Sequence, residues 1–414
     1  MRAAFKHRSE CRICRGRDIV KVLSFGPTPL ANAFLKANET RRMEQYFPLD
    51  VYLCEICGLV QLMDVVSPEI LFKDYVYVSS TSSVFVAHFK GFAGSVYERF
   101  RLAPESLVID IGSNDGVLLR PFQELGTRVL GVEPDRALSA LARKVGVETM
   151  TSFFTLSVAK KILKTHGRAD VITATNVFAH IDDIHTLAKG VSTLLKKDGV
   201  FIIEVPYLVD FLQKNFFDTV YHEHLSYFSV TVLNRFFERV GMELFDVEKV
   251  SSHGGSLRVF AQKRGAKHRQ SRVVKSFMQN EKKLKLSHRK TYHEYALRIQ
   301  KNRAKLTSLL IGLRQKGKTI AGYGAPAKGN TLLNFFSIGN DILSYIVDDS
   351  PQKQGMFTPG KRIPVVASAV LRTDPPDYLL IIAWNFTESI IKKNELFIKN
   401  GGRFIIPVPH PRII

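Results

Sequence analysis

All four cysteines of this 414-residue chain fall in two CxxC pairs, and this spacing strongly limits how the N-terminal region can fold. Two thiolates on one turn and two on another match the tetrahedral coordination that zinc prefers. Such a closed site leaves no open position for chemistry, so we predict a structural zinc. The alternatives are disulfides or a redox CxxC, but neither a signal peptide nor a thioredoxin-like context accompanies the cysteines. The predicted ligands are Cys11, Cys14, Cys54 and Cys57.

The positive charge of the chain is concentrated in one segment. The sequence carries 59 Lys or Arg residues against 38 Asp or Glu, a formal net charge of +21. Eighteen of the basic residues lie between Ala261 and Lys318, where Glu281 and Glu294 are the acids. A charge run of this kind is typical of a solvated helical face, with a polyanion site as the alternative. Because no recognisable nucleic-acid module accompanies it, we expect no nucleic-acid partner.

A glycine-bearing turn follows an apolar run in the central region. Residues 107–111 form the run, and residues 112–116 read Gly-Ser-Asn-Asp-Gly. About twenty residues later a second strand-like run ends at Glu133, whose carboxylate can accept both hydroxyls of a ribose. The turn has GxxxG and not the GxGxxG of dinucleotide sites, and it resembles motif I of the class I methyltransferases, which bind S-adenosylmethionine (SAM). The predicted SAM-binding residues are Asp110, Gly112, Ser113, Asn114, Asp115, Gly116, Glu133, Pro134 and Asn176.

The fourth strand of this region, residues 170–175, ends beside Asn176 and His180. Ligands bind outside the carboxyl ends of strands in an open parallel sheet, so we expect both side chains to face the cofactor and the acceptor. The alternative for His180 is a surface or capping residue. Residues 251–256 read Ser-Ser-His-Gly-Gly-Ser, and this segment with His253 is either a hairpin turn or a loop over the acceptor.

Four titratable side chains, Tyr221, His222, Glu223 and His224, directly follow the strand-like segment at residues 200–206. An oxygen or nitrogen acceptor needs little help to take a methyl group, whereas a carbon must first lose a proton. Histidine has the unperturbed pKa nearest to neutral pH, so we predict that His224 is the general base. Glu223 is expected to support that imidazole or to hold a substrate hydroxyl, and Tyr221 to donate to an enolate oxygen. His222 is expected to be structural, because side chains alternate along a strand edge.

The order of these motifs resembles that of the three-domain sugar C-methyltransferases, over nearly the whole chain. The Tyr-His-Glu-His motif and the zinc spacing are its most specific parts. The resemblance implies methyl transfer from SAM to C-3 of a nucleotide-linked 4-keto deoxysugar, with dTDP as the expected nucleotide, in branched-chain deoxysugar biosynthesis. It also makes Tyr75 a second candidate for a catalytic phenol. His180 is a further candidate catalytic residue because of its position at the ligand-binding edge of the sheet. The substrate-binding residues expected from the resemblance are Asn32, Ser80, Ser82, His253, Tyr323, Lys328 and Asn330.

The C-terminal region repeats the strand, turn and helix rhythm. Residues 320–330 carry a GxG turn followed by Lys328, and a helix N-terminus with a lysine can bind a diphosphate. Tyr323 can stack on the base or bond to it. A second acid, Asp348 or Asp349, ends the next strand, so the residues alone leave an NAD site open. The resemblance implies instead that this region closes the substrate cleft and binds no second cofactor.

These patterns predict an α/β protein with an N-terminal zinc module, a central class I methyltransferase domain and a smaller C-terminal Rossmann-like domain. No stretch of the chain approaches membrane-spanning length, and we expect a cytoplasmic monomer or weak dimer with no membrane partner. Two alternatives stay open: a SAM-dependent enzyme for another sugar position or small-molecule acceptor, and a non-catalytic nucleotide-binding assembly protein. Residues 25–32 are rich in turn formers, and we expect them to form a loop. The expected ranges are 1–66 for the zinc module with its substrate-facing loop, 67–263 for the methyltransferase domain, 264–317 for a basic helical connector and 318–414 for the C-terminal domain.

Overall fold

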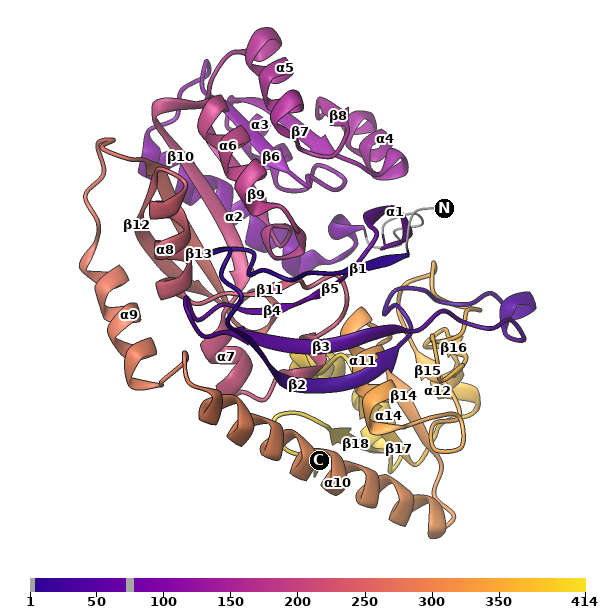
Figure 1. Cartoon of the computed structure of the whole chain (residues 1–414). Helices are drawn as coiled ribbons and strands as arrows, with labels where there is room; N and C mark the ends of the chain where they lie inside the picture. The colour runs from indigo at the N-terminus through magenta and orange to yellow at the C-terminus, as the bar shows by residue number, and fades with distance from the viewer. Residues whose placement is uncertain (1–3, 72–77) are drawn as a thin grey trace.

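The computed structural model describes residues 4–71 and 78–414, apart from the side chain of His253. Figure 1 shows the N-terminal strands in indigo between the central domain, in purple and magenta, and the C-terminal domain, in orange and yellow. One apolar core runs through all three parts, with Leu53, Phe217 and Phe336 among its buried members. Phe217 stacks on Phe336 with ring centroids 4.9 Å apart, so aromatic side chains join the central and C-terminal domains.

The N-terminal region is built on an antiparallel sheet. Its long strands β2 (Ile19–Thr28) and β3 (Phe47–Cys54) pair with each other, and β4 (Val60–Leu62) continues the sheet beside β3. The fourth strand, β11 (Ser226–Tyr227), pairs with β4 although it follows His224 in the chain. The segment that leaves the Tyr-His-Glu-His motif therefore enters the N-terminal sheet. The other elements here are β1 (Phe5–His7), η1 (Ala37–Glu39), β5 (Asp64–Val66) and α1 (Pro68–Leu71).

The central domain is a seven-stranded sheet with helices on both faces, as the alternating sequence pattern predicts. Five strands run parallel, and an antiparallel hairpin closes one edge. The spatial order is β12 (Met242–Val250), β13 (Ser256–Lys263), β10 (Leu195–Pro206), β9 (Ala169–Thr175), β6 (Leu107–Ile111), β7 (Arg128–Glu133) and β8 (Thr149–Thr151). The helices are η2 (Ser79–Thr81), α2 (Ser83–Phe100), α3 (Leu119–Glu124), α4 (Arg136–Lys144), α5 (Leu156–His166), η3 (Phe178–His180), α6 (Ile184–Leu194), α7 (Leu208–Gln213), η4 (Phe217–Thr219), α8 (Val230–Arg239) and η5 (Ser252–Gly254).

The C-terminal domain is a smaller sheet whose strands are parallel except for the last one. The predicted α/β class and the order of the three domains are thus confirmed. The spatial order is β16 (Val365–Val366), β15 (Ile346–Val347), β14 (Ile320–Tyr323), β17 (Tyr378–Ile381), β18 (Arg403–Ile406) and β19 (Arg412–Ile413). The helices are α11 (Ala327–Phe336), α12 (Val370–Thr373), η6 (Trp384–Phe386), α13 (Thr387–Lys393) and α14 (Glu395–Lys399).

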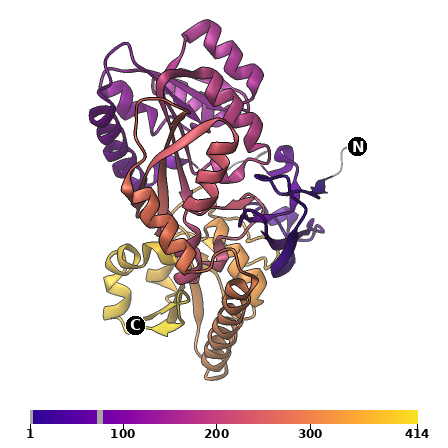
Figure 2. The same ribbon diagram turned by 60° about the vertical axis from the view of Figure 1, so that its left-hand side comes forward.

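Two helices, α9 (Arg272–Lys283) and α10 (Arg289–Gln315), carry most of the basic segment. In Figure 1, α10 runs along the lower edge of the molecule, where it packs against β2, and Figure 2 shows it at the foot of the molecule. Tyr292, Tyr295 and Ile299 begin a buried stripe at helical spacing, and most basic residues of α10 lie on its exposed side. Within the described ranges, no helix is both long and apolar enough to cross a bilayer.

Two local expectations were wrong. Residues 25–32 do not all form a loop, because β2 continues to Thr28. As an edge strand it tolerates Pro27, and an irregular register at this point accommodates Gly26 with its φ of 73°. The Tyr-His-Glu-His motif does not follow its strand directly, since α7 and η4 intervene and the motif itself is a turn. Five of the six α7 residues, including Asp210, are buried, so no amphipathic pattern marked that helix.

Candidate active site

The turn after β6, residues 112–116, lies at the carboxyl edge of the central sheet, where ligands bind, and is called the SAM turn below. Gly112 and Gly116 have φ values of 70° and 83°, and Asn114 has a φ of 51°. A Cβ on Gly112 would lie 2.8 Å from Val177 Cγ2, so glycine is needed here for both conformation and space. The Gly112 N–H donates to the Val132 carbonyl at 2.8 Å, which holds the turn against β7.

Three buried polar atoms at this edge have no hydrogen-bond partner among the described residues. They are Ser113 Oγ, Asp115 Oδ1 and Asn176 Oδ1. A buried polar atom without a partner costs about 1 to 3 kcal/mol, so the three atoms fit a polar ligand that would satisfy them. Asn176 also has a φ of 57°, a left-handed conformation that asparagine tolerates better than most residues.

Two carboxyl groups flank the turn. Glu133, at the end of β7, accepts the N–H groups of Asn114 and Asp135, both at 2.9 Å, and burial raises its pKa. Asp110 accepts the Thr173 hydroxyl at 2.6 Å, and burial raises its pKa to about 7. Pro134 follows Glu133 directly and leads into α4. The predicted cofactor residues therefore surround one turn, and their donors and acceptors suit the polar groups of SAM.

His224 lies between two other rings with one nitrogen already bonded. Its Nδ1 is 2.7 Å from the Thr219 carbonyl, which can only accept, so Nδ1 carries the proton and Nε2 bears the lone pair. The Tyr221 ring centroid lies 3.9 Å away and the His180 ring stacks at 5.0 Å. Burial, with a smaller contribution from His180, lowers the pKa of His224 to about 3, so the imidazole is neutral at physiological pH.

Glu223 and His222 point to different neighbours. The Asn32 Nδ2 donates to Glu223 Oε1 at 2.6 Å, and burial raises the pKa of Glu223 to about 7. His222 is buried, and its Nε2 lies 3.3 Å from the Phe47 carbonyl of β3. The bond that orients His224 comes from a main-chain carbonyl of η4 and not from Glu223. Of the two roles expected for Glu223, binding of a substrate hydroxyl stays a prediction. The motif is a turn, so side chains do not alternate along a strand edge as we expected. His222 and His224 nevertheless have different neighbours.

The C-terminal domain reaches this site at the start of α11. The Asn330 Nδ2 donates to the Ala31 carbonyl at 2.6 Å, beside the residue that bonds Glu223. The Thr331 hydroxyl donates to the Val220 carbonyl at 2.8 Å, immediately before Tyr221. The Tyr-His-Glu-His motif, called the acceptor motif below, is thus held between the N-terminal loop and the C-terminal domain. The predicted residues that the structure brings together are Asn32, His180, Tyr221, Glu223, His224 and, through Ala31, Asn330.

Lys328 lies in the contact between the central and C-terminal domains. Its Nζ is 3.4 Å from the Trp384 ring centroid and 2.6 Å from Asn385 Oδ1. The Trp384 Nε1 donates to Asp218 Oδ2 at 2.6 Å. Burial lowers the pKa of Lys328 to about 8 and raises that of Asp218 to about 6, while the opposite charges limit both shifts. A phosphate ligand at Lys328 would therefore meet a partly buried cation beside an aromatic ring.

The other predicted substrate residues lie elsewhere. The Ser80 N–H donates to Asp115 Oδ2 at 3.2 Å, beside the SAM turn, and the Ser82 hydroxyl caps the N-terminus of α2. Tyr323 is only 2 % exposed, and its hydroxyl lies 3.5 Å from Asp349 Oδ2, so its ring is not presented for stacking. Two predicted positions fall outside the described part of the chain: Tyr75 and the side chain of His253.

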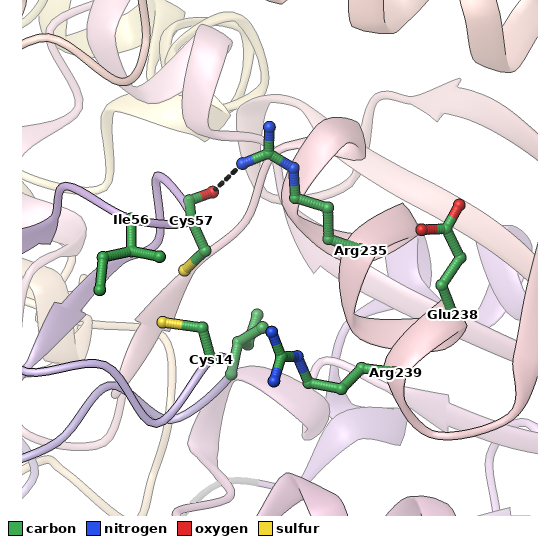
Figure 3. A pocket seen from close by; sticks show the side chains of 7 residues that line it. Cys14, Ile56, Cys57, Arg235, Glu238 and Arg239 are labelled. Carbon is green, nitrogen blue, oxygen red and sulfur yellow. Dashed lines mark hydrogen bonds between the residues drawn. The ribbon is translucent and has the colours of Figure 1, made fainter.

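The two CxxC pairs come together as predicted. The four sulfur atoms all lie within 4.8 Å of one another, and the Sγ atoms of Cys11 and Cys57 are 3.5 Å apart. Four thiolates at this separation suit tetrahedral zinc. A hollow of about 420 Å³ adjoins the cluster, and Figure 3 shows Arg235 of α8 beside it, where its Nη1 donates to the Cys57 carbonyl at 3.0 Å. No residue of the SAM turn or of the acceptor motif lines this hollow.

Sequence reasoning missed several contributors to the site. Thr219 acts through its main-chain carbonyl, which leaves no sequence signal. Trp384 is the single tryptophan of the chain, and that rarity could have drawn attention to it. Arg12 lies inside the first CxxC pair and is 1 % exposed, although an arginine there suggests a solvated surface.

Comparisons with known proteins match the chain in three consecutive parts. Three protein-family models match: a zinc-binding domain at residues 11–72, a methyltransferase domain at residues 86–247 and a C-methyltransferase C-terminal domain at residues 251–409. A ubiquinone biosynthesis O-methyltransferase of Rhodopseudomonas palustris is 25% identical over 96 residues, 23% of this chain and 38% of that protein. The magnesium protoporphyrin IX methyltransferase of Synechocystis is 14% identical with a TM-score of 0.33, covering 44% of this chain and 81% of its own, and this weak likeness decides nothing.

A much longer match is with the C-methyltransferase NovU of Streptomyces niveus. The two sequences are 41% identical over 405 residues, which cover 98% of this chain and 96% of NovU. The match therefore includes the cysteine pairs, the SAM turn, the acceptor motif and the C-terminal domain. The chain belongs to the family of SAM-dependent C-methyltransferases with an N-terminal zinc-binding domain.

Proposed function

We propose that the protein methylates C-3 of a nucleotide-linked 4-keto deoxysugar through an enolate. The observation that carries the proposal is the hydrogen bond between His224 Nδ1 and the Thr219 carbonyl. It leaves Nε2 as a base, and burial keeps that base neutral. The sugar, its C-3 position and the dTDP carrier are supported by the resemblance to sugar C-methyltransferases. A hydroxyl acceptor would not need such a base together with a buried carboxyl group.

His224 begins the reaction as a proton acceptor. A carbonyl at C-4 makes the C-3 hydrogen acidic, and Nε2 takes that proton while the electron pair moves onto the C-4 oxygen. The Tyr221 hydroxyl then donates a hydrogen bond to that oxygen. The low pKa of His224 makes it a weak base at rest, but the enolate is an anion beside the new imidazolium and stabilises it in the buried site. His180 stacks against the base and helps to hold its ring.

Other residues bind the reactants. Glu133 would accept the ribose hydroxyls of SAM, and Ser113, Asp115 and Asn176 would bond its remaining polar groups. SAM, when bound, supplies the methyl group as an electrophile. Glu223, held by Asn32, would accept a sugar hydroxyl. The predicted substrate-binding role of Lys328 is to hold the diphosphate, and the zinc in the four-cysteine site is structural.

The zinc-loaded protein can be tested with SAM and a panel of dTDP-linked 4-keto sugars in D₂O. Mass spectrometry follows methyl transfer, and NMR follows deuterium incorporation at C-3. We expect transfer to carbon, and exchange at C-3 even without SAM, because deprotonation needs only the base. A folded, SAM-binding protein that gives neither reaction with any sugar contradicts the proposal. An O-methylated product would assign the protein to a hydroxyl acceptor instead.

Glu223 predicts a specific dependence on pH. Its pKa of about 7 means that it is protonated below neutral pH, when it cannot accept a charge-assisted bond from the sugar. We expect kcat/KM for the nucleotide sugar to rise by about tenfold per pH unit up to about pH 7 and then level off. His224 does not produce this limb, because its pKa is about 3. The E223Q variant should lose the limb while SAM is saturating, and a limb that persists in E223Q would assign it to another group.

A further inference from the structure

Arg12 links the zinc site to the acceptor site through buried hydrogen bonds. It lies between Cys11 and Cys14, and its side chain is fully buried. Nη1 donates to the Leu225 carbonyl at 3.1 Å and to the Leu62 carbonyl at 2.5 Å, and Nε donates to Asp182 Oδ1 at 3.1 Å. The side chain therefore leaves the N-terminal module and contacts two segments of the central domain.

Those two segments carry the stacked histidines. Leu225 directly follows His224, and its N–H donates at 2.9 Å to the carbonyl of Ala179, the residue before His180. Asp182 lies two residues after His180. Arg12 thus contacts the chain just beyond each member of the His180 and His224 pair, whose rings are 5.0 Å apart. A displacement of either segment would move the base relative to its neighbours.

Cys11 and Cys14, on either side of Arg12, belong to the four-cysteine cluster, so bound zinc would hold the main chain of Arg12 in place. The same turn is also held from the central domain, because His185 Nε2 lies 3.0 Å from the Ile13 carbonyl. The second cysteine pair has a comparable contact, from Arg235 to the Cys57 carbonyl (Figure 3). That contact ends on α8 and reaches neither histidine segment, so it provides a matched comparison.

We infer that Arg12 is a positioning residue, through which the zinc-bound turn holds the segments carrying His180 and His224 in the arrangement needed for deprotonation. This inference rests on the proposed function, since it assumes that His224 is the base. The physical basis is that a small displacement of a catalytic group lowers the reaction rate strongly. SAM binding should not change, because the SAM turn lies on a different element and Arg12 does not contact it.

The test compares R12M with R235M, each in the full-length, zinc-loaded protein. We expect R12M to lower C-3 exchange without SAM and kcat for transfer by about tenfold to 100-fold, with unchanged zinc content and unchanged Kd for SAM. R12K should recover part of the loss, because an ammonium can bond the two carbonyls but not Asp182 as well. R235M should keep the wild-type exchange rate. A purely structural role for Arg12 would lower zinc content or thermal stability without separating exchange from SAM binding.

D182N decides the matter if R12M does not fold. It removes the charged partner of Arg12 with little change in shape, and we expect lower exchange with zinc retained. Wild-type exchange in zinc-loaded R12M or D182N overturns the inference, as does an equal loss in R235M. The wild-type protein is measured beside the variants. If the wild type itself shows no C-3 exchange, the proposed function is overturned, and this result differs from a loss that is confined to the variants.

Discussion

The H224A variant is expected to lose C-3 exchange and methyl transfer together, by about 10²- to 10⁴-fold, while its affinity for SAM stays unchanged. Nε2 of His224 is the nitrogen left to take a proton, because Nδ1 is bonded to the Thr219 carbonyl. SAM binding should survive, since the cofactor turn belongs to β6 and β7 and shares none of these contacts. Rates of deuterium exchange by NMR, transfer by mass spectrometry and SAM binding by calorimetry measure the three quantities separately.

His222 provides the matched control. It is a buried histidine of the same turn, but its Nε2 faces the Phe47 carbonyl of β3. We expect H222N to lower thermal stability and to keep the exchange rate of the folded protein. Added imidazole should restore part of the exchange in H224A, because the deleted ring leaves space beside His180 and Tyr221. Full exchange in H224A would rule out this base, and equal losses in H222N and H224A would indicate a general disturbance of the turn.

The parts of the fold that the sequence predicts are those coded by local patterns. The CxxC spacing predicted the four-cysteine cluster, and the apolar run before Gly112 predicted β6 with its ligand-binding turn. Each depends on residues close together in the chain. β11 was not predicted, because it has two residues and pairs with β4 from a distant part of the chain. Long-range pairing of this kind has no local sequence pattern.

The candidate site shows the same limit at the level of single atoms. Residue type indicated a base among Tyr221, His222, Glu223 and His224, but it could not indicate a carbonyl as the partner of His224. Residue type also could not predict the hydrogen bond from Asn32 to Glu223, because these residues belong to different domains. The roles of main-chain atoms and of contacts between domains depend on the completed fold, and they decide here which nitrogen of His224 can act.

The four-cysteine cluster and the acceptor motif both adjoin the antiparallel sheet of β2, β3, β4 and β11, so removal of zinc should affect catalysis more than SAM binding. β11 continues the chain from His224 and pairs with β4, which follows Cys57 in the N-terminal sheet. Zinc contributes about 10 to 16 kcal/mol of apparent binding free energy in small four-ligand domains, far more than a few strands can replace. On one face the central sheet has an apolar cluster of its own, with Phe89, Phe92 and Val108 among its members, so we expect this sheet to stay folded without the metal.

We therefore expect C54S, or the wild type treated with a strong chelator, to lose zinc and all detectable methyl transfer while still binding SAM. Cys54 ends β3 and is fully buried, whereas Ile56, between the second pair of cysteines, is 54 % exposed, so I56S is the control that should keep both zinc and activity. Hydrogen exchange should show opening of β3, β4 and β11 with protection retained in β6 and β7. Transfer that survives with zinc removed would show that the metal does not support the acceptor site. Loss of SAM binding together with zinc would show instead that the central sheet cannot fold without the N-terminal module, contrary to the separate apolar cluster that it buries.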